Sequence, residues 1–339
     1  MGSRVTIADV AALAGVHKAT VSRALNDATR GQVNVETLRR VQKAAKSLGY
    51  VPNVMARGLR TRLSMTVGVI IPDLTNPIFP PVIRGIENYL SPRGYTALLA
   101  NTDSRDALER SAVNSLLERQ VDGFLIATGV EDHPIIPALF ERAIPAVMVN
   151  RDAGNVPYPL VSGNNAAGVT AAVAHLKELG HRRIIHLAGP SNFSTSRIRA
   201  ESFVRACHEA HVQGTVIDVP SLSAEDGEKS VDALLAERQT FTAIQASNDL
   251  LALGALRSLR AHGLRCPQDV SVIGFNDMPF AEEFSPGLTT VHVPLQEIGT
   301  ESARILLDSI ESRTISSVAV MLPVSLIVRS STGAPPSSS

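Results

Sequence analysis

The chain has 339 residues, enough for two or three domains with full cores, and its 32 Lys and Arg residues balance 32 Asp and Glu residues. A hydrophobic content of 44% is that of an ordinary soluble protein, and the lack of any apolar run of about eighteen residues excludes a membrane span. The N-terminus lacks a signal-peptide pattern and the two cysteines, Cys207 and Cys266, form no metal-type cluster, so we expect a cytoplasmic protein without metal or cofactor.

Positive charge is concentrated at the N-terminus. Residues 1–63 hold eleven Lys and Arg but three Asp and Glu, so they carry a net charge of +8 and the remainder carries −8. A small basic region on an acidic body is typical of nucleic-acid-binding proteins. A basic tail that only aids solubility is the alternative, but the same residues also have the pattern of a folded domain.

Three short helices are predicted in this basic region. Thr6 and Asp9 have the spacing of an N-terminal capping box, and Gly15 ends the first helix. Asn34 can cap the third helix, which Gly49 ends. Two short helices joined by a glycine-containing turn, with a third supporting them, form the helix-turn-helix plan.

The second helix, from about His17 to Asn26, has two different sides. At about 100° per residue, one arc is polar and the other side is mostly apolar. The polar arc suits contacts with base edges and phosphates, and the apolar side suits a small core. The arc comprises Lys18, Ala19, Ser22 and Arg23, and the opposite side comprises Thr20, Val21 and Ala24.

From Met65 onward, apolar runs alternate with amphipathic stretches. This alternation is typical of βαβ units, in which a largely parallel sheet is covered on both faces, and the length favours two such units. The predicted strands are residues 66–71, 96–100, 123–127, 146–149, 184–188, 243–246 and 270–274.

Polar residues follow several of these strands. Ligands of open α/β sheets bind beyond the carboxyl ends of the strands, so Asn76, Asn150, Asn248 and Asn276 are candidate ligand contacts. Arg199 is expected to begin a helical turn after the strand at 184–188. Taken alone, each Asn is equally well explained as a helix cap or a turn residue.

Several motifs in the order of one family carry a resemblance over the whole chain to about residue 332. Residues 5–26, VTIADVAALAGVHKATVSRALN, and residues 49–59, GYVPNVMARGL, resemble the signature and hinge segment of the lactose/galactose repressor (LacI/GalR) family. Further matches lie at 67–79, 121–123, 179–183, 248–249, 272–277 and 288–290. The resemblance implies an α/β fold: an N-terminal all-α helix-turn-helix head and a periplasmic-binding-protein-like clamshell of two parallel-sheet α/β lobes.

The resemblance also implies a domain plan. Residues 1–52 would form the DNA-binding domain, 53–62 a hinge helix, 63–333 the effector-binding and dimerisation core, and 334–339 a disordered tail. The core would contain a first lobe of approximately 63–162 and 293–322 and a second lobe of approximately 163–292 and 323–333. We expect the chain to cross between the lobes near 162–165, 291–294 and 322–325.

For DNA, the resemblance assigns base reading to Lys18, Ala19 and Arg23. Contacts with phosphates, or support of the helix, would come from Thr6, Thr20, Ser22 and Asn26. The hinge helix would be capped by Asn53, would include Ala56, and would insert Leu59 between base pairs of the minor groove. Two features depart from the family pattern: His17 replaces a capping serine, and the loop 27–33 is two residues longer than in the lactose repressor.

For the effector, the resemblance implies a pocket that binds a sugar or a sugar derivative. Its residues would be Asn76, Ile78, Phe79, Asn150, Arg199, Asn248 and Asn276. Asn276 stands where sugar-binding members often have Asp, and Leu222 stands near an aromatic position of some members. A neutral Asn beside Arg199, with Arg151 nearby, favours an acidic sugar, such as a sugar acid or sugar phosphate.

The predicted function is sequence-specific DNA binding by a homodimeric transcriptional regulator, a repressor, on a pseudo-palindromic operator under allosteric control. The sequence leaves open whether the effector releases DNA or promotes binding, and whether the protein acts as a repressor or as an activator. A transport binding protein and an α/β enzyme fused to a DNA module are the alternatives, but no nucleophile elbow, Walker loop or His-Glu-x-x-His motif occurs. Cys207 and His211, with His208 between them, could form half a metal site, although chance histidines on a surface helix explain them better.

Overall fold

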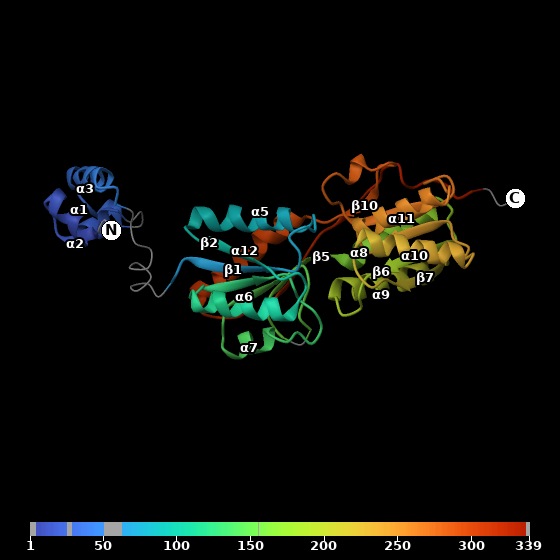
Figure 1. The fold of residues 1–339 in the computed structure, drawn as a ribbon, viewed down its shortest axis with the longest axis horizontal. Coiled ribbons are helices and arrows are strands. Elements are labelled where there is room, and N and C mark those ends of the chain that lie inside the picture. Colours follow the sequence, from blue (N-terminus) through green and yellow to red (C-terminus); the bar gives the residue numbers. More distant parts are fainter. Residues whose placement is uncertain (1–4, 26–28, 51–62, 155, 337–339) are drawn as a thin grey trace. The chain divides into compact units, whose positions relative to one another are not determined.

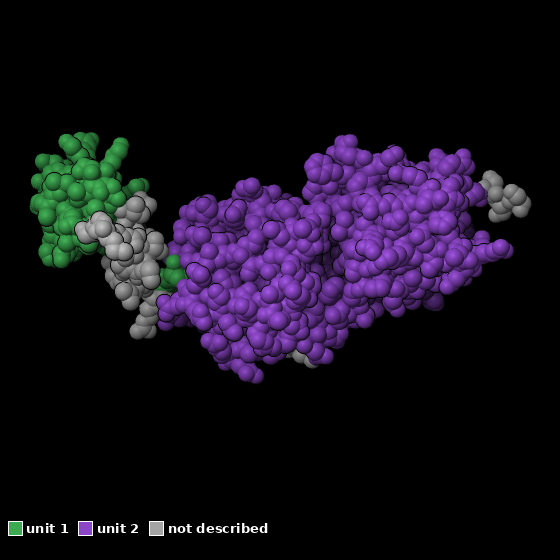
Figure 2. Space-filling model, viewed as in Figure 1, with its two compact units in different colours: residues 1–64 green, residues 65–339 purple. Residues whose placement is uncertain are grey.

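The computed structural model describes residues 5–25, 29–50, 63–154 and 156–336. The chain divides into two compact units, residues 1–64 and residues 65–339, coloured separately in Figure 2. Among the described residues, no helix combines the length and the apolar composition needed to cross a bilayer.

The smaller unit is a bundle of short helices, and its first helix begins and ends as the sequence predicts. The backbone N–H of Thr6 donates to Asp9 Oδ2 at 2.8 Å in a capping box, and Gly15 ends the helix with a φ of +64°. Such a left-handed conformation is least strained in glycine. The elements are α1 (Ile7–Ala14), α2 (Lys18–Ala24), the 3₁₀ turn η1 (Arg30–Gln32) and α3 (Val35–Ser47).

The other two helices are also capped by side chains. Asn34 Oδ1 accepts from the backbone N–H of Glu36 at 2.9 Å at the start of α3. His17 Nδ1 accepts from the N–H of Ala19 at 3.2 Å, so histidine does cap α2 despite its departure from the family pattern. The three helices meet in a core of small apolar side chains: Val10, Ala11, Ala14, Val21, Ala24, Val41, Ala44 and Ala45.

The larger unit contains two six-stranded sheets, here called sheet A and sheet B (Figure 1). Sheet A has the order β11-β5-β4-β3-β1-β2, and sheet B has the order β12-β10-β9-β8-β6-β7. All neighbouring strands are parallel except β12, which runs antiparallel to β10. The strands are β1 (Thr66–Ile71), β2 (Thr96–Asn101), β3 (Gly123–Ile126), β4 (Ala146–Val149), β5 (Leu160–Gly163), β6 (Arg183–Ala188), β7 (Gln213–Asp218), β8 (Ala243–Ala246), β9 (Ser271–Asn276), β10 (Thr289–His292), β11 (Ala319–Leu322) and β12 (Ser325–Ile327).

Helices cover both sheets, as expected for parallel strands joined by crossover helices. In the first lobe, built on sheet A, α5 packs on α12; in the second lobe, built on sheet B, α8 packs on α9 and α10 packs on α11. The helices are α5 (Phe79–Leu90), α6 (Asp106–Glu118), α7 (Ile136–Glu141), α8 (Asn165–Glu178), α9 (Ser194–Ala210), α10 (Ala224–Ala236), α11 (Asp249–Ala261) and α12 (Leu295–Ser312), with 3₁₀ turns η2 (Ser91–Arg93) and η3 (Ala281–Glu283).

The chain passes between the sheets three times. It leaves sheet A after β5, returns from sheet B after β10, and leaves sheet A again after β11. The strands predicted at 66–71, 146–149 and 243–246 have the same bounds in the structure, whereas β5, β7, β10, β11 and β12 were not predicted. Four of these five strands, all but β11, contain polar residues that interrupt the apolar run that marks a buried strand.

Helices α5 and α12 approach each other closely at two glycines. A Cβ built on Gly85 would collide with the backbone carbonyl of Gln296, and one built on Gly299 would collide with that of Val82. The backbones can therefore touch only because both positions lack a side chain.

Gly85→Ala is therefore expected to destabilise the larger unit by roughly 1–3 kcal/mol, because the two helices must move apart. Urea unfolding followed by far-ultraviolet circular dichroism measures this change. Gly31→Ala, in the smaller unit, is the control for the substitution itself, since a Cβ at that position has open space around it and the unfolding of the larger unit should not change. Equal stabilities of the two variants would show that the contact between the helices is not a constraint.

Candidate functional site

Helix α2 presents the polar arc that was predicted for reading DNA. Lys18, Ala19 and Arg23 are exposed, while Val21 and Ala24 on the opposite side are buried. The Arg23 side chain lies along its own helix, with Nε donating to the carbonyl of Ala19 at 3.3 Å. The arc therefore faces solvent, and the buried side of α2 packs into the core of the smaller unit, which fixes the position of the helix.

Of the other residues predicted to contact DNA, three are described by the structure and four are not. Thr6 is exposed at the start of α1, and Thr20 and Ser22 are half-buried on α2. Asn26, Asn53, Ala56 and Leu59 lie outside the residues that the structure describes. The hydroxyl of Thr29 donates to the carbonyl of Arg23 at 3.1 Å and so closes the C-terminal end of α2.

In the larger unit, the second candidate site centres on the buried guanidinium of Arg199. Arg199 does not begin its helix as predicted, because α9 already begins at Ser194 and places Arg199 in the second turn. Its Nε donates to Asn165 Oδ1 at 2.8 Å, and its Nη2 donates to Asn276 Oδ1 at 3.4 Å. It also donates to the carbonyl of Ser247 and stacks over the Phe275 ring, with 3.7 Å from Cζ to the ring centroid.

Burial governs the electrostatics around this guanidinium. Burial lowers the pKa of Arg199 to about 9; the negative charge of Asp249 opposes this shift, and the positive charge of Arg151 adds to it. Burial also raises the pKa of Asp249 to about 7, against the hydrogen bonds from the Thr290 hydroxyl and the Met278 N–H. Both groups therefore lie in a region where charge is poorly solvated.

The four predicted asparagines play different roles. Asn248 caps α11, since its Oδ1 accepts from the N–H of Leu251 at 2.8 Å and its Nδ2 donates to the carbonyl of Leu222 at 2.9 Å. Asn276 is the last residue of β9, not a residue after it, and contacts Arg199 directly. Asn76 Oδ1 accepts from the N–H of Ile78 at 3.3 Å in a turn.

The effector-site residues predicted in the first lobe make no hydrogen bond or ring contact with Arg199 among the described residues. Ile78 and Phe79 are both buried, and Phe79 begins α5. Asn150 is buried after β4 with a φ of +66°, and its carbonyl accepts from the Ser162 hydroxyl at 2.9 Å. Over the described ranges, no hydrogen bond or ring contact links these residues to Arg199.

Contacts between the lobes involve residues that sequence reasoning did not list as site residues. The Arg151 guanidinium lies over the Phe193 ring, 4.1 Å from Cζ to the ring centroid. The N–H of Asp152 donates to Ser194 Oγ at 3.1 Å, and the N–H of Glu131 donates to the carbonyl of Asn192 at 2.9 Å. On the face seen in Figure 2, the larger unit is hollowed between its two halves.

Two residues of this region, Arg151 and Asn165, were visible in the sequence although neither was listed as a site residue, and Arg151 was already expected near Arg199. Arg151 directly follows Asn150, and Asn165 ends the segment predicted as the first crossing between the lobes. Position along the chain alone does not show that Asn165 meets Arg199, because the two residues are 34 positions apart.

The side chains of the possible half metal site on α9 do not come together around a common point. Cys207 is buried with its Sγ toward Gly214, and burial raises its thiol pKa to about 11. His211 lies beyond the end of α9 in a left-handed conformation. Within the described part of the chain, no three His, Cys, Asp or Glu side chains gather as a metal site requires.

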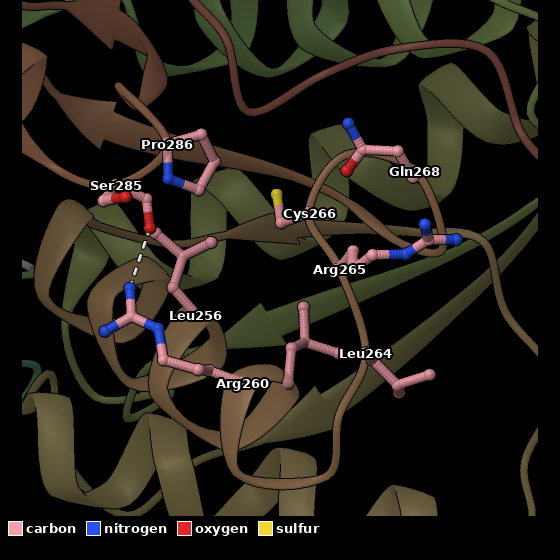
Figure 3. A pocket seen from close by; sticks show the side chains of 9 residues that line it. Leu256, Arg260, Leu264, Arg265, Cys266, Gln268, Ser285 and Pro286 are labelled. Atoms are coloured by element: carbon pink, nitrogen blue, oxygen red, sulfur yellow. Dashed lines mark hydrogen bonds between the residues drawn. The ribbon is translucent and has the colours of Figure 1, made fainter.

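A separate pocket of about 470 Å³ lies at the other end of α11. Figure 3 shows Arg260 with its hydrogen bond to the carbonyl of Ser285, beside Leu264 and Cys266. The pocket lies near the start of β9, not near its carboxyl end, and none of the predicted site residues lines it. It is therefore distinct from the Arg199 site.

Comparisons with known proteins match both units. Residues 6–53 match the family model of bacterial regulatory proteins of the lacI family, and residues 173–332 match that of periplasmic binding protein-like domains. The ribose operon repressor of Halalkalibacterium halodurans is 35% identical over 327 residues, which are 96% of this chain and 97% of that protein.

Solved structures agree with these matches. The lac repressor dimer bound to operator and the anti-inducer ONPF superposes with a TM-score of 0.87 at 28% identity, covering 98% of this chain and 100% of that one. A LacI family transcriptional regulator from Enterococcus faecalis V583 with bound ribose has a TM-score of 0.71 at 32% identity, covering 79% of this chain and 99% of that one. The predicted fold, a helix-turn-helix head with two parallel α/β lobes, is confirmed.

Burial of His186 on β6, against the Phe203 ring, makes the stability of the larger unit depend on pH. Its Nδ1 donates to the carbonyl of Gln245 at 2.9 Å, and burial lowers its pKa to about 4, below its usual 6.5. The unfolded chain therefore binds the proton more tightly. Stability from this group is complete above pH 6.5 and falls by roughly 2 kcal/mol on acidification to pH 5.

His186→Asn keeps an N–H donor near Nδ1 and removes the titrating group, so the loss of stability between pH 6.5 and 5 should become smaller. Unfolding by urea at several pH values measures the slope. His262→Asn, at a partly exposed position, is the control. An unchanged slope in His186→Asn would show that another group causes the pH dependence.

Proposed function

Because the chain belongs to the LacI family of bacterial transcriptional regulators, we propose that it represses transcription by binding a pseudo-palindromic operator as a homodimer, under the control of a small-molecule effector. The observation that carries this proposal is the combination of an exposed basic helix α2 on one unit and a buried polar site on the other. A cytoplasmic location belongs to the same proposal. The family consists of regulators and not of enzymes, which removes the fused-enzyme alternative.

The DNA-binding role is supported by the positive charge of the smaller unit and by the exposure of Lys18, Ala19 and Arg23 on α2. Lys18, Ala19 and Arg23 would read base edges in the major groove, where arginine suits guanine O6 and N7. Thr6, Thr20, Ser22 and Asn26 would fix the register on the phosphates. In the hinge segment, Asn53 would cap a helix that includes Ala56 and inserts Leu59 into the minor groove.

The effector role is supported by the polar residues around Arg199. Arg199, Asn248 and Asn276 would face the effector from the second lobe, and Asn76, Ile78, Phe79 and Asn150 from the first. The Enterococcus faecalis relative carries bound ribose and the Halalkalibacterium halodurans relative is a ribose operon repressor. A sugar or sugar derivative is therefore the effector class that we propose for this chain.

Control would work through the three connections between the lobes. An effector that binds one arrangement of the lobes more tightly shifts the population toward that arrangement. The proposed organisation is a head at 1–52, a hinge at 53–62, a core at 63–333 and a tail at 334–339. Operator and effector would then change each other's affinity by the same factor, and the coupling free energy is typically about 1–3 kcal/mol.

Dimerisation is supported by exposed apolar side chains on one edge of sheet A. Leu99 on the edge strand β2 and Leu74 after β1 are 44% and 49% exposed. They lie close together, because the N–H of Leu74 donates to Oδ1 of Asn101, two residues along β2. An apolar patch beside an open strand edge is a suitable surface for a second copy of the chain.

Arg23→Ala should weaken operator binding roughly 5- to 150-fold, the equivalent of 1–3 kcal/mol for a lost base contact. Fluorescence anisotropy with operator DNA selected from a random pool measures the change. Lys229→Ala removes the same charge from an exposed position on α10 and should leave the affinity unaltered. The proposal fails if the intact protein binds DNA with no dependence on salt concentration, because phosphate contacts release counterions.

Leu99→Asp should convert the dimer into a monomer, because it places a charge in the proposed apolar interface. Light scattering after size-exclusion chromatography measures the mass. Val318→Asp is the control, since Val318 is 47% exposed beside β11, the opposite edge strand of sheet A. A Leu99→Asp protein that remains dimeric would place the interface elsewhere.

A further inference from the structure

Two arginines are buried in the larger unit, one in each lobe. Arg151 follows β4 in the first lobe and is 6% exposed, while Arg199 on α9 in the second lobe is 4% exposed. Arg151 lies over the ring of Phe193, the residue that precedes α9, and Arg199 is in the second turn of that helix, so both arginines are placed around the start of α9. The positive charge of Arg151 also contributes to the lowered pKa of Arg199. Two like charges held this way in a poorly solvated region are unfavourable unless a negative charge accompanies them.

The carboxylates of this region make their hydrogen bonds and ion pairs with other groups, and of those that the structure describes only Asp249 acts on Arg199, raising its pKa through its charge against the effect of burial. Asp249 accepts hydrogen bonds from Thr290 and Met278. Asp277 pairs with Arg329 at 2.8 Å and with His292 at 3.0 Å. Across the described residues, neither Arg151 nor Arg199 has a carboxylate within ion-pair distance.

Neutral groups hold both guanidiniums in place. Arg199 donates to the carboxamides of Asn165 and Asn276 and to a backbone carbonyl, which orient it without cancelling its charge. Arg151 lies on the Phe193 ring, and no side-chain hydrogen bond occupies its guanidinium among the residues that the structure describes.

We propose that Arg151 and Arg199 together bind the anionic group, a carboxylate or a phosphate, of a polyhydroxylated effector. This inference rests on the proposed function, in which the Arg199 site takes the effector. Guanidinium groups suit both anions because their parallel N–H bonds match the oxygen geometry. Since one arginine belongs to each lobe, the bound anion also draws the two lobes together, as the contact of Arg151 with Phe193 already does.

Matched pairs of sugars test this inference on the intact protein. Calorimetry compares D-galactose with D-galacturonate, D-glucose with glucose 6-phosphate, and D-ribose with ribose 5-phosphate, which separates carboxylates from phosphates. At least one anionic member should bind about tenfold or more tightly than its neutral partner, a difference of about 1.4 kcal/mol. Arg151→Met should abolish this preference, and Arg265→Met, at an exposed arginine paired with Asp269, should retain it.

Asn276→Asp gives a second test that keeps both arginines. It places a carboxylate beside Arg199 Nη2, so the anionic sugar should bind about tenfold more weakly while the neutral partner is little affected. This variant keeps the inference falsifiable if Arg151→Met does not fold. Thermal unfolding with inorganic phosphate, against chloride at equal ionic strength, provides a probe that does not depend on the choice of sugar, and phosphate should stabilise the wild type more than Arg151→Met.

Neutral sugars that bind as tightly as their anionic partners would overturn the inference. The absence of binding by every anionic sugar, together with no specific stabilisation by phosphate, would overturn it equally. If a neutral sugar binds at least as tightly as its anionic partner and changes operator affinity, the inference fails while the proposed function stands. If anions bind at Arg151 but the protein does not bind operator DNA, the proposed function fails instead.

Discussion

The guanidinium of Arg199 is a buried charge whose hydrogen-bond partners are all neutral, and these partners come from separate parts of the second lobe. Removing such a group from water is costly unless its N–H bonds find acceptors. Here the acceptors come from three places: Asn165, where α8 begins directly after the first crossing, and Ser247 and Asn276 at the carboxyl ends of β8 and β9. A ligand that changes the position or charge of Arg199 therefore acts on the crossing segment as well as on the sheet.

The two units differ in how their positive charges meet solvent: those of the smaller unit are exposed, whereas two arginines of the larger unit are buried. The head carries exposed positive charge, which suits the highly charged and hydrated DNA backbone and gives affinity that depends on salt. The larger unit holds two of its positive charges, Arg151 and Arg199, in a buried region, where hydration is weak and a single anion has a large effect. A protein with a net charge of zero can thus attract a polyanion with one unit and select a small ligand with the other.

Local features were predictable from the sequence, and contacts between distant residues were not. The capping box at Thr6, the cap at Asn34 and the end of α1 at Gly15 depend on residues within one turn, and all three are found. The partners of Arg199 are 34, 48 and 77 positions away, so only the folded chain reveals them. Asn248 illustrates the ambiguity, since the sequence supports both a ligand contact and a helix cap, and its side chain does cap α11.

The central claim is that a ligand bound in the body changes the affinity of the head for DNA. The most direct measurement is the affinity of the intact protein for its selected operator, with and without each sugar or sugar acid that stabilises the body against heat. The account predicts that at least one such compound changes the operator affinity roughly 5- to 150-fold, with an equal effect of operator on the affinity for that compound. Compounds that bind the body but leave operator affinity unchanged would contradict it.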